Sequence, residues 1–158
     1  MVIYGVSFDM VGKQPIVLLK TSDSNKFLPI WIGHPEAAAI LMKLQGATTP
    51  RPMTHDLLKN MIDDLDARVE RIVVCDLKDN TFYAAIHVST AGSARHVVDA
   101  RPSDAIALAL RTGSPIFVDD RVIESARAVD STPENMDVSR VQKWLEGLSD
   151  DDLGKYKM

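Results

Sequence analysis

Apolar residues recur along the chain with two different spacings, and these spacings separate strand segments from helix segments. Residues 2–11, 15–21 and 26–32 are rich in β-branched and aromatic types, and turn-forming residues lie between them. Three short strands with tight links predict an antiparallel meander. Pro29 has no amide donor, so we expect it at a sheet edge or a bulge.

Two helices are expected after this meander. The first opens at Pro35-Glu36 and runs to Gln45, with Gly46 as its stop, because proline and an acid are favoured in a first turn. The second follows Thr54, which fits an N-cap, and its apolar residues repeat at helical spacing. These residues are Leu57, Leu58, Met61, Ile62 and Leu65.

From Arg68 the apolar spacing changes to two, which is typical of strands. Three further strands follow, at 68–77, 81–89 and 94–100. The helix that opens at Pro102 is apolar nearly all round, so we expect it to be buried. A short strand and a short helix come next, at 115–118 and 122–129.

These elements predict an α+β fold with two antiparallel β-meanders and helices packed against a mixed sheet. The length of 158 residues and an apolar share of 46% are typical of one globular domain, which we place at residues 1–129. Residues 130–158 hold seven acidic and four basic residues and predict an acidic C-terminal helix and tail.

Charge and cysteine content limit the classes of function. The net charge of −4 lies mostly in the tail, so binding of a nucleic acid must rest on a local group of arginines. Cys75 is the single cysteine, which excludes an intramolecular disulfide and a multi-thiolate metal site. No apolar run approaches the ~20 residues of a membrane span, and the N-terminus does not resemble a secretory signal. We therefore expect a cytoplasmic protein without a membrane partner.

Common nucleotide-binding and hydrolase motifs are absent. The sequence contains no G-x-x-x-x-G-K-[ST], G-x-G-x-x-G, G-x-S-x-G, H-E-x-x-H or C-x-x-C. Polar residues gather instead at two Arg-Pro helix starts, 51–56 and 99–104. A helix start binds anions, and an adjacent arginine presents a planar fork to phosphate oxygens.

Each of these polar residues has a catalytic and a structural interpretation. Asp99 and Asp104 can share a divalent cation, which Glu36 can join, and His55 can act as a general acid or base. Taken one at a time, acids in a first helical turn are explained more simply by the helix dipole, and Arg101 can serve only to fix a loop by pairing with Asp99 or Asp104. The apolar residues Trp31, Met42, Met53 and Met61 suit either an ordinary core or an interface.

Five stretches together make the sequence recognisable. They are LPIWIGHPEAAAI (28–40), PRPMTHDLL (50–58), TFYAAIHV (81–88), VDARPSDAIALALR (98–111) and PIFVDDRVI (115–123). In this order they resemble the bifunctional nuclease domain family, over about residues 1–129. The resemblance implies a single α+β domain and a nuclease that acts on both DNA and RNA.

The resemblance and the residue chemistry together give a set of candidate roles. The catalytic candidates are His55, Asp56, Asp99 and Asp104. The substrate-binding candidates are Arg51, Thr54, Arg101 and Ser103. The candidate ligands of a Mg²⁺ or Mn²⁺ ion are Asp99, Asp104 and Glu36.

Two functions of different classes follow. One is a metal-assisted phosphodiesterase that cleaves DNA and RNA. The alternative is a non-catalytic oligomeric module that binds a small anion or a partner protein. We expect a homo-oligomer in either case, because edge strands and methionine-bearing helices need to be covered.

Overall fold

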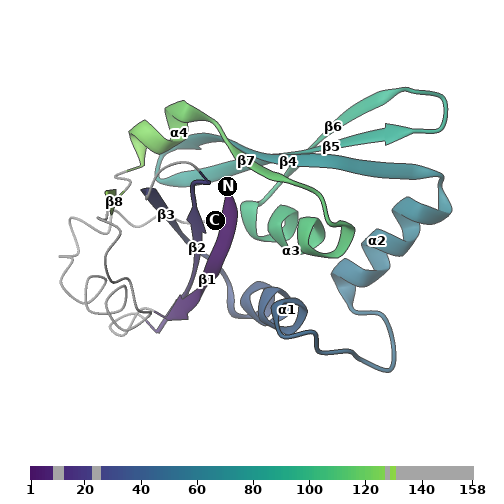
Figure 1. Ribbon diagram of the computed structural model, residues 1–158, viewed down its shortest axis with the longest axis horizontal. Coiled ribbons are helices and arrows are strands. Elements are labelled where there is room, and N and C mark those ends of the chain that lie inside the picture. The colour runs from purple at the N-terminus through teal and green to yellow at the C-terminus, as the bar shows by residue number, and fades with distance from the viewer. Residues whose placement is uncertain (9–12, 23–25, 127–128, 131–158) are drawn as a thin grey trace.

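Two β-sheets and a layer of helices enclose the apolar core (Figure 1). The computed structural model describes residues 1–8, 13–22, 26–126 and 129–130. Buried side chains from both sheets and from the helices form one continuous hydrophobic cluster. None of the described helices is long and apolar enough to span a membrane.

The first sheet is the predicted N-terminal meander. Its antiparallel strands, in spatial order, are β1 (Val2–Phe8), β2 (Pro15–Lys20), β3 (Lys26–Trp31) and β8 (Val129–Asp130). β8 pairs only with Lys26 and Phe27, so Pro29 lies on the part of β3 that β8 does not cover. This position agrees with the expected edge location of a residue that has no amide donor.

The second sheet is mixed, as expected. Its strands, in spatial order, are β6 (Arg95–Ala100), β5 (Thr81–Thr90), β4 (Ala67–Lys78) and β7 (Ile116–Val118). The three consecutive strands pair antiparallel, whereas β4 and β7 pair parallel. A parallel neighbour requires a crossover, which the third helix supplies.

The helices are α1 (His34–Leu44), α2 (Thr54–Asp64), α3 (Pro102–Thr112) and α4 (Asp120–Ser125). α2 and α3 pack against one face of the second sheet, and α1 packs against α3 and the first sheet (Figure 1). Residues 105–109 of α3 are all buried, which confirms the prediction of a helix enclosed nearly all round. The C-cap of α3 is Gly113, whose φ of 69° is a left-handed conformation that glycine adopts without strain.

Three predictions about local structure need correction. The N-cap of α2 is Met53 rather than Thr54, and its amide donates to the Asp56 carboxylate at 3.0 Å. Residues 122–129 do not form one helix, because α4 ends at Ser125 and Val129 belongs to β8. The predicted helix and tail at 130–158 lie outside the described residues, apart from the backbone of Asp130 in β8.

The apolar stripe of α2 also differs from a core stripe. Met53, Leu57, Leu58, Met61 and Leu65 are exposed. Trp31, in contrast, is buried in the first sheet. The ordinary-core interpretation therefore fits Trp31 but not Met53 and Met61, whereas Ile62 of α2 packs against the core.

The burial of α3 leads to a stability prediction. Leu108→Ala removes a side chain that is 0% exposed, and we expect it to lower the free energy of unfolding by about 2–5 kcal/mol. Leu57→Ala, at 53% exposure on α2, is the matched control and should change it by about 0.5 kcal/mol or less. Urea unfolding measures both, and equal effects would contradict the assignment of α3 as the central core helix.

Candidate functional site

A chain of bonded polar side chains joins three helices. Nε2 of His55, on α2, lies 3.0 Å from Oδ1 of Asp104 at the start of α3. Arg101 donates from Nε to the other oxygen of Asp104 at 2.8 Å and from Nη2 to Glu36, on α1, at 2.7 Å. We call these residues (Glu36, Arg101, Asp104 and His55) the polar chain.

Local sequence chemistry explains how the polar chain is placed. Arg101 has extended backbone angles and is the N-cap of α3, and Pro102 fixes the first helical position. Asp104 then falls in the first turn, where the helix dipole favours an acid. Glu36 lies in the first turn of α1 for the same reason. His55 thus bonds to Asp104, and Glu36 bonds to Arg101, at opposite ends of the Arg101–Asp104 pair.

Electrostatics keep Asp104 ionised. Burial by itself raises the pKa of Asp104, but the hydrogen bonds from Arg101 and His55 outweigh it, so the net pKa lies below its ordinary value. The pKa of Arg101 is raised by the hydrogen bonds to Asp104 and Glu36. Because an ionised carboxylate only accepts, the bond to Asp104 requires the proton of His55 to be on Nε2.

The polar chain is partly open to solvent. The Arg101 side chain is 51% exposed and that of Asp104 is 32% exposed, whereas Glu36 and His55 lie deeper. Nδ1 of His55 is bonded to none of the described residues, and it is not among the fully buried unpaired atoms. No hydrogen bond within the described residues therefore uses its lone pair.

A second charged pair lies beside the polar chain. Nε of Arg111, near the end of α3, donates to Oδ1 of Asp56 at 2.5 Å, and Nη2 donates to the Ala39 carbonyl of α1 at 3.2 Å. The Arg111 side chain is only 5% exposed. Its contacts connect α1, α2 and α3, so Asp56 has a structural partner where the sequence suggested a catalytic role.

This structural role of Arg111 was not assigned from the sequence. The spacing of charged residues along α3 could have indicated this role. Asp104 and Arg111 are seven residues apart, which places them two turns apart on one face of α3. His55 and Asp56 are neighbours on α2, and each meets one of these two residues.

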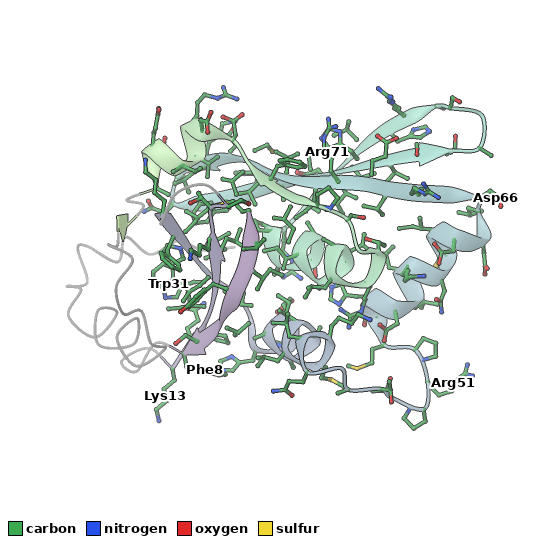
Figure 2. All side chains as sticks on the ribbon, viewed as in Figure 1. Phe8, Lys13, Trp31, Arg51, Asp66 and Arg71 are labelled. Carbon is green, nitrogen blue, oxygen red and sulfur yellow. The ribbon has the colours of Figure 1, made fainter. Side chains whose placement is uncertain are left out.

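The other candidates lie apart from the polar chain. Arg51 lies in the loop between α1 and α2, and Figure 2 shows it at the outer end of that loop. Thr54 is exposed at the first position of α2. Ser103 is fully buried, and its hydroxyl has no partner among the described residues, so it does not reach a ligand at the surface.

Asp99 lies on the other face of the second sheet. It pairs with Ala85 of β5, whereas the neighbouring Ala84 and Ile86 are buried toward α3. Because side chains alternate between faces, Asp99 projects away from α3. The structure does not bring Asp99 and Asp104 to one point.

The carboxylates do not fit a resident metal ion as they are arranged. Among the described residues, no three His, Cys, Asp or Glu side chains are grouped to hold an ion. Glu36 and Asp104 are bridged by the guanidinium of Arg101, whose charge compensates both. A cation would have to displace this arginine.

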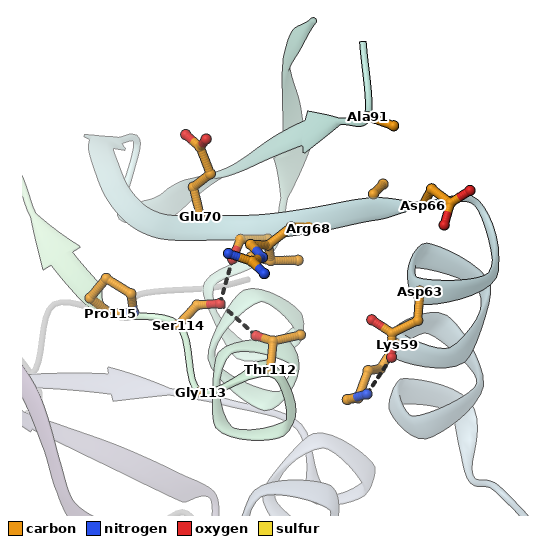
Figure 3. A pocket seen from close by; sticks show the side chains of 12 residues that line it. Lys59, Asp63, Asp66, Arg68, Glu70, Ala91, Thr112, Gly113, Ser114 and Pro115 are labelled. Carbon is orange, nitrogen blue, oxygen red and sulfur yellow. Dashed lines mark hydrogen bonds and ion pairs between the residues drawn. The ribbon is translucent and has the colours of Figure 1, made fainter. Parts of the chain in front are cut away.

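Two cavities lie near α2. One, of about 980 Å³, lies between the C-terminal parts of α2 and α3 and the start of β4 (Figure 3). Its lining includes Lys59, Asp63 and Arg68 but no member of the polar chain. The second, of about 300 Å³, is bounded by the α1–α2 loop and contains Asp56 and Arg111 in its wall.

Comparison with known proteins decides the family. The model of the bifunctional nuclease domain matches residues 17–131. The chain belongs to the bifunctional nuclease domain family. The matched region includes every residue of the polar chain, so the resemblance noted in the sequence is confirmed.

Relatives of this bifunctional nuclease domain fall into two groups. An uncharacterized protein of Mycobacterium tuberculosis is 35% identical, over 96% of this chain and 95% of its own. Bifunctional nuclease 1 of Arabidopsis thaliana is 30% identical over 75% of this chain, and bifunctional nuclease 1 of Oryza sativa subsp. indica is 26% identical over 85%. The alignments cover only 39% and 42% of these plant proteins.

The Asp56–Arg111 pair leads to a prediction about stability. Asp56→Ala leaves a buried guanidinium without its carboxylate, and we expect it to lower the free energy of unfolding at neutral pH by about 2 kcal/mol. Asp63→Ala removes an exposed acid that pairs with Lys59 on the same helix, and its effect should stay below about 1 kcal/mol. Urea unfolding of both variants tests the difference.

The same pair predicts a dependence on pH. Burial raises the pKa of Asp56, but the hydrogen bonds from Arg111 and from the Met53 amide lower it to a net value below the ordinary one. Its stabilising effect is therefore complete above the unfolded-state pKa of about 3.9 and is lost as pH falls through the folded-state pKa. The difference between wild type and Asp56→Ala should shrink below about pH 4, and a constant difference would be inconsistent with this pairing.

Proposed function

We propose that this protein is a nuclease that hydrolyses phosphodiester bonds in DNA and RNA, with the polar chain as its active site. The observation that carries the proposal is the bonded series His55–Asp104–Arg101–Glu36 at a helix start, in a member of the bifunctional nuclease domain family. The imidazole of His55 can accept a proton, and Asp104 fixes its tautomer. Arg101, which is bonded to Asp104, presents an exposed guanidinium.

His55 is the proposed general base. Asp104 holds the proton on Nε2, which leaves the lone pair of Nδ1 to take a proton from water. The water oxygen attacks the phosphorus as the bond to the leaving oxygen breaks, and solvent supplies the proton that the leaving oxygen takes up. Asp104 also stabilises the imidazolium that forms.

Arg101 is the proposed phosphate-binding group. Its bonds to Asp104 and Glu36 use two of the five N–H donors of a guanidinium, and its side chain is half-exposed. The remaining donors can bind the phosphate oxygens that gain charge during the attack. The start of α3 adds a partial positive charge at the same place.

One observation favours the non-catalytic alternative. Arg101 already compensates the charges of Glu36 and Asp104 and ties α1 to α3, which is what a purely structural clamp would do. In that case the site would bind a small anion at Arg101 without chemistry. Loss of Asp104 abolishes cleavage if the site is catalytic, whereas it lowers only the stability of the fold if the site is structural.

Cleavage of single-stranded DNA and RNA by stringently purified protein tests the proposal. We expect wild type to cleave both, and His55→Gln and Asp104→Asn to lose activity by about 100-fold or more, because general-base catalysis contributes on this scale. Asp63→Asn is the matched control, since it removes an acid of α2 outside the polar chain and should retain activity.

Thermal unfolding of each variant accompanies the assay, so that a loss of fold is distinguished from a loss of chemistry. Parallel reactions with EDTA report whether an ion brought in with the substrate takes part. Equal cleavage by wild type, His55→Gln and Asp104→Asn would reject the polar chain as the active site. Absence of cleavage, with Asp104→Asn only less stable, would favour the structural alternative.

A further inference from the structure

β6 is an open edge of the second sheet. In the described part of the chain its only strand neighbour is β5 (Figure 1). Residues 95–99 are all exposed, and Val97 reaches 64% exposure. An edge strand that carries apolar side chains is a template for pairing with another strand.

The hydrogen-bonding phase of the hairpin shows which groups of β6 point outward. The Thr90 amide donates to the Ala94 carbonyl at 3.0 Å, which marks the first hydrogen-bonded pair beyond the turn. Hydrogen-bonded and non-hydrogen-bonded pairs alternate along an antiparallel ladder. The pairs Ser89–Arg95, His87–Val97 and Ala85–Asp99 are therefore of the non-bonded type. The N–H and C=O groups of Arg95, Val97 and Asp99 point away from β5.

The side chains of the same three residues form a self-complementary pattern. Arg95 and Asp99 lie two positions before and after Val97, on the same face of the strand. If two copies of β6 pair antiparallel about a two-fold axis at Val97, Arg95 of each copy lies directly opposite Asp99 of the other. The two valines then face each other at the axis.

We propose that β6 pairs with β6 of a second copy of this chain in this register, which forms a two-fold symmetric dimer. The outward amides and carbonyls of Arg95, Val97 and Asp99 bond across the interface, and two Arg95–Asp99 ion pairs flank the central valines. Neighbouring registers lack this match. An axis at Val98 places Arg95 opposite Arg101, and an axis at His96 places it opposite Val97.

The dimer continues the second sheet through both copies, so that eight strands form one surface. A two-fold axis perpendicular to the sheet leaves α2 and α3 of both copies on the same side. His96 and Val98 project toward that side, where they face each other across the new strand pair. Asp99, which the sequence suggested as a metal ligand, acquires a role in assembly instead.

Charge reversal on β6 tests both the dimer and its register. Sedimentation should give wild type twice the mass of one chain. Arg95→Asp and Asp99→Arg each place like charges opposite one another twice, and we expect each variant alone to weaken dimerisation at least tenfold. A mixture of the two variants restores opposite charges at both positions and should form a heterodimer. Arg121→Asp, on α4, is the matched control and should remain dimeric.

A proline variant tests the backbone contacts. Val97→Pro removes an amide that points away from β5, so the monomer keeps its internal ladder while the pairing loses a central donor. We expect a folded monomer, as judged by circular dichroism and thermal unfolding. A monomeric wild type would overturn the proposal. So would single charge variants that remain dimeric, or a mixture that fails to associate while both variants are folded.

Discussion

Burial of α3 is the constraint on which the other features depend. This helix packs against α1, α2, β4 and β5, and its central five residues are inaccessible to solvent. Alanines at positions 105, 107 and 109 let neighbouring backbones approach closely, and Ile106 and Leu108 fill the space between them. A helix enclosed in this way can carry charge only where its two ends reach the surface.

The two charged clusters occupy these ends. At the start of α3, Asp104 faces His55 and is compensated by Arg101, and near its end Arg111 faces Asp56. Each cluster follows the sign of the helix dipole, with the acid in the first turn and the base in the last. Since both clusters also contact α1, the packing of three helices and the geometry of the polar chain are not independent.

Periodicity predicted the elements well because each meander and each helix has a local signal. Residue spacing alone predicts the two meanders and the burial of α3. The residue types Pro35 and Gly46 predict where α1 begins and ends. The exposure of the α2 stripe does not follow, because helical spacing shows which residues share a face and not whether anything covers it. The spacing likewise did not predict the two irregularities in the pairing of β4 with β5.

The candidate site was predicted in part, and its limits have a simple geometric cause. The segments 51–56 and 99–104 were grouped from the sequence as one candidate site, and the contact of His55 with Asp104 joins the two helix starts. Asp99 was grouped with Asp104 because they are five residues apart in the sequence. Between them, however, the chain leaves a strand, in which side chains alternate, and enters a helix at Arg101. Nearness in sequence across such a junction does not imply a shared site. Asp99, on the strand, therefore projects from the outer face of the sheet, whereas Asp104, on the helix, belongs to the polar chain.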